Sequence, residues 1–417
     1  MSFLYITADR VGLANHGGGS VTQNEAAALR SLGPCEVLGR PALETEYGEE
    51  PWKWDRSACF QVTDRLPVRI SGYIASGQIG GFSGRSPDWP RPETFIGKEP
   101  KLAHFYAGTF SETVASLQRN GTKVTYTAAA HDLTVSRREH EKLGLLYNYD
   151  HLTRPELWKR YLQGYKDADT LIVPSTHSRD VMRGFGCQNR IEVIPHGVDL
   201  PKCRRCDGSG FEPFDTVRPD LKNSYACIVC QGSKLEPVKP SPPHFRVGYL
   251  GSVTAPDKGV RYLLEAWKKL NYKDATLVLA GHDSTSPLAF EMVRVFGGGN
   301  INLRGWVENV GDFYDDISLY VQPSASEGFG LEILEAMAHG RPVLASTGAG
   351  ASDLLTYSKN DSRFASCDAN LLAAYIDQVR KHWDLEFVSR ENRRLAENYT
   401  WDKIRARYVE AWKELLN

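Results

Sequence analysis

The sequence contains no run of about 18 apolar residues, the length that a helix needs to cross a bilayer. Its first residues, Ser2 to Thr7, lack the cationic segment that opens a secretory signal peptide, and they predict a first β-strand. Neither sign of charge is in excess, because the formal net charge is −1, so no global attraction to nucleic acid or anionic membranes is expected. These absences together predict a soluble, cytoplasmic protein.

The chain has 417 residues, which is too many for one hydrophobic core and suits two domains of about 150 to 200 residues with additions. Four of its eight cysteines are scattered along the chain and are expected to be small core residues: Cys35, Cys59, Cys187 and Cys367. The other four are clustered and are treated below.

The segment from Ile317 to Ser346 carries the most functional information. It predicts a buried strand, a glycine-bearing loop, a helix that ends near Gly340, and a second strand. Glycines in such a loop let backbone N–H groups approach an anion, and the helix N-terminus adds positive partial charge. The carboxylates of Glu327 and Glu335 suit the paired hydroxyls of a sugar. The segment therefore predicts a nucleotide-sugar site, and an ordinary βαβ unit with surface glutamates is the alternative.

The run from Glu327 to Ser346 resembles the Glu-x7-Glu signature of the retaining glycosyltransferases of family four, which have the GT-B fold. This resemblance implies two Rossmann-like α/β domains with a cleft between them. It implies that Glu335 holds the nucleotide ribose and that Glu327 contacts the donor sugar and is catalytic. The loop residues implied in donor binding are Gly328, Phe329, Gly330 and Leu331.

Two features of the N-terminal half also resemble this family. Gly18 and Gly19 follow the first predicted strand, where the family has a Gly-Gly loop beside the donor diphosphate, although any tight strand-to-helix turn has such glycines. His131 follows the predicted strand Val124 to Ala129, at the end of a strand where open α/β sheets bind ligands. The resemblance implies a catalytic role for His131 near the transferred sugar, and a structural histidine is the alternative.

The second half begins with the predicted strand Phe245 to Leu250 and a loop that leads to Lys258. A lysine at this helix start can place a point charge on a diphosphate, with an ordinary surface lysine as the alternative. Family members usually have an arginine where this chain has Ser252, which is assigned to the donor site by position. One of the two cations expected beside the diphosphate is therefore missing from this position. Three explanations are open: another residue supplies the charge, the donor binds weakly, or the donor differs from those common in the family.

Four cysteines form two Cys-x-x-Cys pairs, Cys203 with Cys206 and Cys227 with Cys230, separated by 20 residues. This spacing is typical of a four-cysteine structural zinc site, which is closed because four thiolates leave no open position. Each pair resembles a knuckle of the DnaJ zinc-binding region. The module is expected to be a structural staple, with partner docking or a nucleic-acid contact as alternatives.

The run from Ile191 to Asp199 resembles the family's hinge sequence, with His196 in place of the usual asparagine. We therefore predict four parts: an N-terminal acceptor domain (1–199), a zinc-knuckle insertion with linker (200–240), a nucleotide-sugar domain (241–400), and a C-terminal helix that crosses back (401–417).

The resemblance implies sugar transfer from a nucleoside-diphosphate sugar with retention of configuration and without a catalytic metal. The acceptor is open among small molecules, glycans and nucleic acid, and the sequence leaves the oligomeric state open. The alternatives are a nucleic-acid-modifying glycosyltransferase that holds DNA or RNA with the zinc module, and a non-catalytic sugar-nucleotide-binding protein.

Overall fold

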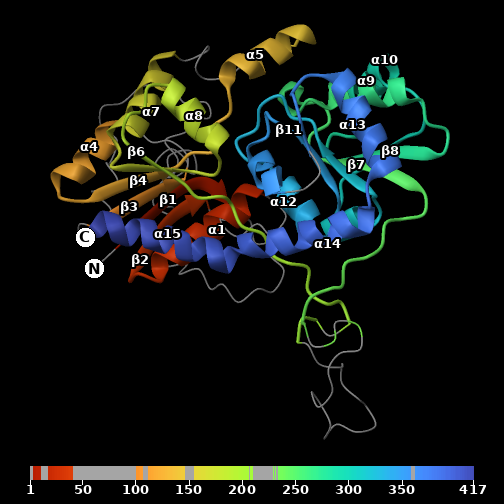
Figure 1. The fold of residues 1–417 in the computed structure, drawn as a ribbon. Coiled ribbons are helices and arrows are strands. Elements are labelled where there is room, and N and C mark those ends of the chain that lie inside the picture. Colours follow the sequence, from red (N-terminus) through yellow and green to blue (C-terminus); the bar gives the residue numbers. More distant parts are fainter. Residues whose placement is uncertain are drawn as a thin grey trace, which may run out of the picture. The chain divides into compact units, whose positions relative to one another are not determined.

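The computed structural model consists of two compact α/β units (Figure 1). It describes residues 3–10, 17–40, 100–106, 111–145, 155–205, 207–209, 229, 231, 233–357 and 362–417. The first unit comprises Met1–Leu133, Gly144–His196 and Trp401–Asn417, and the second comprises Thr134–Leu143 and Gly197–Thr400.

The first unit is built on a six-stranded sheet with the order β2-β1-β3-β4-β5-β6, in which every neighbouring pair is parallel. Its strands are β1 (Phe3–Arg10), β2 (Cys35–Arg40), β3 (Leu102–Tyr106), β4 (Lys123–Thr127), β5 (Thr170–Val173) and β6 (Arg190–Val193). Its helices are α1 (Gly17–Arg30), α4 (Ser111–Arg119), α7 (Pro155–Asp167), α8 (Thr176–Gly184) and α15 (Trp401–Leu416).

Side chains alternate across this sheet, as the two-residue period of a strand requires. In β4, Val124 and Tyr126 join one apolar cluster, and the intervening threonines are buried on the opposite face. On that opposite face the carboxylate of Glu25 is fully buried and accepts hydrogen bonds from Tyr5 (2.8 Å), Thr127 (2.7 Å) and Tyr408 (2.8 Å). This network ties α1 and α15 to the sheet.

The second unit contains a parallel sheet with the order β12-β11-β10-β7-β8-β9. Its strands are β7 (Phe245–Leu250), β8 (Ala275–Ala280), β9 (Ile301–Gly305), β10 (Leu319–Gln322), β11 (Val343–Ser346) and β12 (Arg363–Phe364). Its α-helices are α5 (Leu133–Lys142), α9 (Val260–Leu270), α10 (Pro287–Phe296), α11 (Val310–Asp315), α12 (Leu331–Ala338), α13 (Ala369–His382) and α14 (Leu385–Ala396). Short 3-10 helices are η4 (Pro256–Lys258), η5 (Gly350–Tyr357) and η6 (Glu397–Tyr399).

Both faces of the second sheet are covered, so its strands are apolar on both sides. In β10, Leu319 and Val321 join the cluster that includes α9 and α13, whereas Tyr320 joins the cluster that includes α12. Figure 1 shows α9 and α13 packed together on one side of this sheet. The two parallel α/β sheets confirm the predicted fold class.

Helix α5 departs from the predicted domain boundary at residue 199, because its residues from Thr134 onward group with the second unit. The reason is a buried carboxylate: Glu139 is 3% exposed and accepts a hydrogen bond from Tyr262 of α9 (2.6 Å) and another from Lys142 (2.9 Å). These partners hold the pKa of Glu139 below its usual value although burial alone would raise it. The charge fixes α5 against α9.

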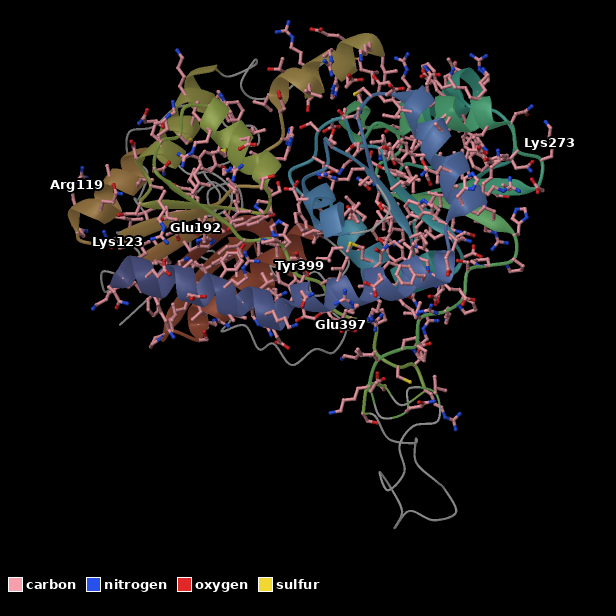
Figure 2. All side chains as sticks on the ribbon, in the orientation of Figure 1. Arg119, Lys123, Glu192, Lys273, Glu397 and Tyr399 are labelled. Carbon is pink, nitrogen blue, oxygen red and sulfur yellow. The ribbon has the colours of Figure 1, made fainter. Side chains whose placement is uncertain are left out.

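The chain passes between the units at four places, and two of them, after His196 and before Trp401, lie side by side. Val198 forms a parallel bridge with Thr400, and its N–H donates to the carbonyl of Tyr399 (2.9 Å). Figure 2 labels Glu397 and Tyr399 on this turn, η6, between α14 and α15.

Within the described part of the chain, no helix is both long and apolar enough to cross a membrane.

Candidate functional site

The candidate donor site is formed by loops at the carboxyl ends of β7, β8 and β10 in the second unit. The loops after β7 and β10 touch through their backbones, because the N–H of Ala325 donates to the carbonyl of Asp257 (2.8 Å). A Cβ atom on Gly259, which has φ +68°, would lie 2.1 Å from the carbonyl oxygen of Pro323. Glycine is therefore required at 259 for the two loops to meet.

Lys258 and Glu327 face each other at this junction. The Lys258 ammonium, 24% exposed, donates to the Glu327 carboxylate, 20% exposed. Burial alone would lower the pKa of Lys258, but the charges of Glu327 and Glu332 outweigh it and raise that pKa. The ammonium is therefore charged, and it offers the point charge that a diphosphate requires.

Ser252 fixes the loop after β7. Its hydroxyl donates to Asp283 (2.5 Å), whose carboxylate also accepts from the N–H of Val253 (2.8 Å) and from the hydroxyl of Thr254 (2.6 Å). These hydrogen bonds lower the pKa of Asp283 against the raising effect of its burial. The side chain at 252 thus serves as a loop-fixing group held by an anion from the β8 loop.

The segment from Gly328 to Leu331 joins β10 to α12. Gly330 has φ +90° and precedes the first helical residue, Leu331, while Phe329 is buried. The carbonyl of Phe329 accepts from the N–H of Ala351 (2.7 Å), and that of Glu327 accepts from Gly350 (3.0 Å). The loop is thus fixed from both sides, with the N-terminus of α12 beside the Lys258–Glu327 pair.

Glu335 lies one turn into α12 and accepts a hydrogen bond from the hydroxyl of Tyr314 of α11 (2.9 Å). Burial and the charge of Glu332 together raise the pKa of Glu335 to about 7, against the lowering effect of the Tyr314 hydrogen bond. Glu332 itself has a raised pKa because of its burial and the nearby Glu327, with Lys258 opposing. Glu327 and Glu332 therefore both act on Lys258, and Glu332 also acts on Glu335.

The structure thus brings Ser252, Lys258, Glu327 and Glu335 together in one unit with the predicted loop. His131 lies in the first unit, beyond the carboxyl end of β4, and is half-buried. Gly18 and Gly19 form the first turn of α1, because this helix begins at Gly17 and not after the glycines. The roles of all these residues stay predictions.

Asp283 and Tyr314 were not singled out from the sequence. Asp283 lies three residues after the end of β8, and a polar residue just beyond an apolar run is a signal that the sequence offers. The sequence around Tyr314 offers no such signal, because only the packing of α11 against α12 brings the Tyr314 hydroxyl to Glu335.

Of the predicted zinc ligands, only Cys203 is described, and its side chain is buried. Cys206, Cys227 and Cys230 lie outside the described residues. No group of three or more His, Cys, Asp and Glu side chains suited to a metal occurs within the described ranges. The zinc site therefore stays a prediction.

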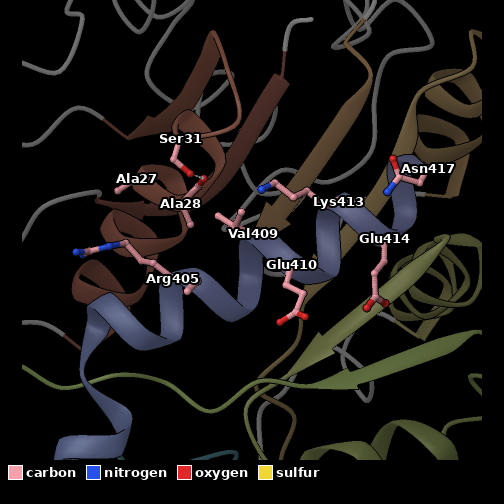
Figure 3. Close-up of a pocket in the computed structure, with 10 residues that line it drawn as sticks. Ala27, Ala28, Ser31, Arg405, Val409, Glu410, Lys413, Glu414 and Asn417 are labelled. Carbon is pink, nitrogen blue, oxygen red and sulfur yellow. Dashed lines mark hydrogen bonds between the residues drawn. The ribbon is translucent and has the colours of Figure 1, made fainter.

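A groove lies elsewhere, between α1 and α15 of the first unit (Figure 3). It has a volume of about 550 Å³ and is lined by Ala27 and Ala28 of α1, by Ser31 just after this helix, and by charged residues of α15, among them Arg405, Lys413 and Glu414. None of the predicted site residues lines it, so the candidate site rests on the loop geometry of the second unit.

Both units match known glycosyltransferase families. Residues 99–202 match the family described as Glycosyltransferase Family 4, and residues 244–382 match Glycosyl transferases group 1. An uncharacterized glycosyltransferase of Methanocaldococcus jannaschii is 28% identical over 171 residues, 40% of this chain and 44% of that protein. The capsular polysaccharide biosynthesis glycosyltransferase CapM of Staphylococcus aureus is 26% identical over 254 residues, 58% of this chain and 61% of CapM. The chain thus spans about half the length of such curated relatives.

Solved structures resemble the whole chain. Sucrose-phosphate synthase from Thermosynechococcus elongatus superimposes with a TM-score of 0.60 at 17% identity, covering 99% of this chain and 98% of that one. Anabaena HepE in complex with UDP superimposes with a TM-score of 0.59 at 15% identity, covering 99% and 100%. The fold is therefore GT-B, and two segments of the chain match models of glycosyltransferase families.

Proposed function

We propose that the protein is a retaining glycosyltransferase that takes a sugar from a nucleoside-diphosphate donor. The observation that carries the proposal is the meeting of Lys258 with Glu327 beside the N-terminus of α12, with Glu335 one turn further along. A cation and a helix N-terminus suit a diphosphate, and two carboxylates suit the hydroxyls of a ribose and a sugar. The matches of both domains to glycosyltransferase families support the same reaction class.

In the proposed reaction the bond between the anomeric carbon and the donor phosphate breaks, and a bond to the acceptor oxygen forms on the same face. Lys258 and the amides of Gly328 to Leu331 stabilise the charge on the departing diphosphate. The acceptor hydroxyl proton passes to that departing phosphate. Lys258 leaves Glu327 for the diphosphate when the donor binds, and Glu327 is then available to the sugar hydroxyls.

UDP-glucose is the first donor to test, because solved structures of similar fold contain UDP or UDP-glucose. Replacing Lys258 with Ala should lower kcat/KM for the active donor by roughly 100-fold, since the diphosphate loses its charged partner. Turnover is measured as released nucleoside diphosphate across UDP-, GDP-, ADP- and TDP-sugars. Lys381→Ala, which removes an exposed lysine paired with Asp377, is the matched control. Binding of a donor without any turnover in the unsubstituted protein would favour a non-catalytic sugar-nucleotide-binding protein.

We further propose that the four cysteines hold a structural zinc ion. Two observations support it. The residue after each Cys-x-x-Cys pair has the same left-handed backbone, with φ +47° at Asp207 and +49° at Gln231. The N–H of Cys203 also donates to the carbonyl of Lys234 (3.0 Å), which closes the insertion into a loop. Zinc would supply cross-linking there and no chemistry.

Purified protein should contain one zinc ion per chain, and Cys230→Ser should lower that content by at least about half, because a structural site needs all four thiolates. Metal content is measured by mass spectrometry. Cys367→Ser, outside the two pairs, should leave the zinc content unchanged. Equal zinc content in both variants, or none in the unsubstituted chain, would contradict the site.

A further inference from the structure

The cysteine-bearing insertion joins the second unit through a short neck, here residues 201–204 and 234–239. The two sides of the neck pair as an antiparallel bridge between Lys202 and Leu235. The N–H of Glu236 donates to the carbonyl of Pro201 (2.8 Å), and the Glu236 carboxylate accepts from the N–H of Arg204 (2.8 Å). The neck is therefore held together by its own hydrogen bonds.

Both sides of the neck contact one helix, α11. The guanidinium of Arg204 meets Asp312 (2.9 Å) and Asp315 (3.1 Å). From the other side, the Lys239 ammonium meets the same Asp315 carboxylate (2.6 Å). Asp315 is 17% exposed, and its pKa is lowered to about 2 by hydrogen bonds from His339 and Lys239, against the raising effect of burial. The neck thus contacts α11 from both sides through charges that converge on Asp315, the most buried of these four side chains.

The residue between these contacts, Tyr314, reaches the donor site. Its fully buried side chain donates to Glu335 (2.9 Å) and to the backbone carbonyl of Glu332 (3.3 Å). Its ring stacks on His339, which caps the end of α12, with centroids 5.2 Å apart. A shift of α11 would therefore move the Tyr314 hydroxyl, which donates a hydrogen bond to the Glu335 carboxylate.

We propose that Arg204 is a positioning residue for donor binding: the neck of the cysteine-bearing insertion holds α11, and α11 holds Tyr314 against Glu335. The inference rests on the proposed function and gives the insertion a part in it, as a brace for the glutamate assigned to the nucleotide. It needs no contact between the insertion and any substrate.

Loss of the Tyr314 hydrogen bond should change both the affinity of the protein for a nucleotide and the pH dependence of that affinity. Glu335 is faced by Glu332 on its own helix, by Tyr314 of α11 and by Tyr320 of β10. Removing the Tyr314 hydrogen bond raises the pKa of Glu335 further, because among these groups only that bond stabilises the charged carboxylate. Only the carboxylate accepts two hydroxyl donors well, so nucleotide binding should then require a higher pH.

The test measures UDP binding by calorimetry from pH 5.5 to 8.5, with GDP, ADP and TDP in parallel. Tyr314→Phe and Arg204→Ala should each weaken binding roughly 3- to 10-fold at pH 7 and shift the midpoint of its pH dependence upward. Arg204→Ala should add little in the Tyr314→Phe background, because both act through one hydrogen bond. Arg204→Lys should recover part of the loss, and Arg294→Ala, which removes an exposed arginine paired with Glu291, should change nothing.

Hydrogen exchange of the ligand-free protein separates this inference from the proposed function. Arg204→Ala should speed exchange in α11 and α12 and leave β1 to β6 unchanged. Unchanged exchange there, or additive losses in the double variant, overturns the inference. If the unsubstituted protein binds no nucleoside diphosphate, the proposed function fails, and faster exchange in both helices still supports the brace.

Discussion

The imidazole of His196 is 3% exposed, at the position where the hinge sequence of related proteins has an asparagine. Burial lowers its pKa from 6.5 to about 4, with the charge of Glu25 opposing. The folded chain therefore keeps this side chain neutral where the unfolded chain would protonate it. Because the unfolded state then binds more protons, the stabilisation is complete above about pH 6.5 and is lost as the pH falls toward 4.

Replacing His196 with Asn should remove that part of the pH dependence, because asparagine does not titrate. The unsubstituted protein should lose about 3 kcal/mol of stability between pH 7 and pH 4 through this group, a difference that the variant lacks. Urea unfolding at pH 7, 5.5 and 4 measures it. His282→Asn, at an exposed position, is the control and should leave the pH profile unchanged. Parallel profiles for His196→Asn and the unsubstituted chain would refute the assignment.

At the scale of elements, the donor loops depend on close backbone contact where β7 and β8 end. Gly281 has φ +145°, and a Cβ there would lie 1.9 Å from the carbonyl oxygen of Gly251. Backbone atoms cannot rotate away as a flexible side chain would. Gly184, in α8, has open space around the corresponding position.

Gly281→Ala should therefore cost about 2 kcal/mol or more, because it combines overpacking with a strained backbone. That cost corresponds to an unfolding midpoint lower by roughly 4 to 8 °C. Gly184→Ala should instead raise stability by about 0.5 to 1 kcal/mol through helix propensity. Calorimetric scans of both variants measure the difference, and equal midpoints would show that the two loops separate without cost.

At the scale of the whole molecule, the apolar clusters of the second unit are separate from that of the first, and the chain crosses between the units after residues 133, 143, 196 and 400. The residues assigned to the nucleotide lie in the second unit, apart from the two glycines of α1. A bound nucleotide should therefore stabilise the second unit more than the first.

Saturating UDP, or whichever nucleoside diphosphate binds, should slow hydrogen exchange most in residues 251–258, 281–283 and 324–335. At 100 times its dissociation constant, the ligand stabilises the unit it binds by about 2.7 kcal/mol. Lys258→Ala should abolish this protection at the same concentration. Equal protection of both sheets would instead mean that the nucleotide is held by the two units alike.

Much of the fold and part of the site were predictable from local patterns. The run around Leu319 predicts a buried strand, and the apolar spacing before Gly340 predicts the following helix, because both patterns depend on neighbouring residues. The predicted boundary at 199 leaves residues 134–143 in the first domain, whereas they group with the second unit, because the partner of Glu139 on α9 is 123 residues away. Distant hydrogen bonds leave no periodic signal in a sequence.

By itself, the sequence determined the parallel α/β architecture and the segment that pairs Glu327 with Glu335, since both follow from the order and spacing of residues along the chain. Only the tertiary structure decided that Ser252 is held by Asp283, that the Tyr314 hydroxyl donates to Glu335, and that Arg204 reaches α11. The physical reason is that charge and hydrogen bonding act through space over about 3 Å, between residues that chain order separates.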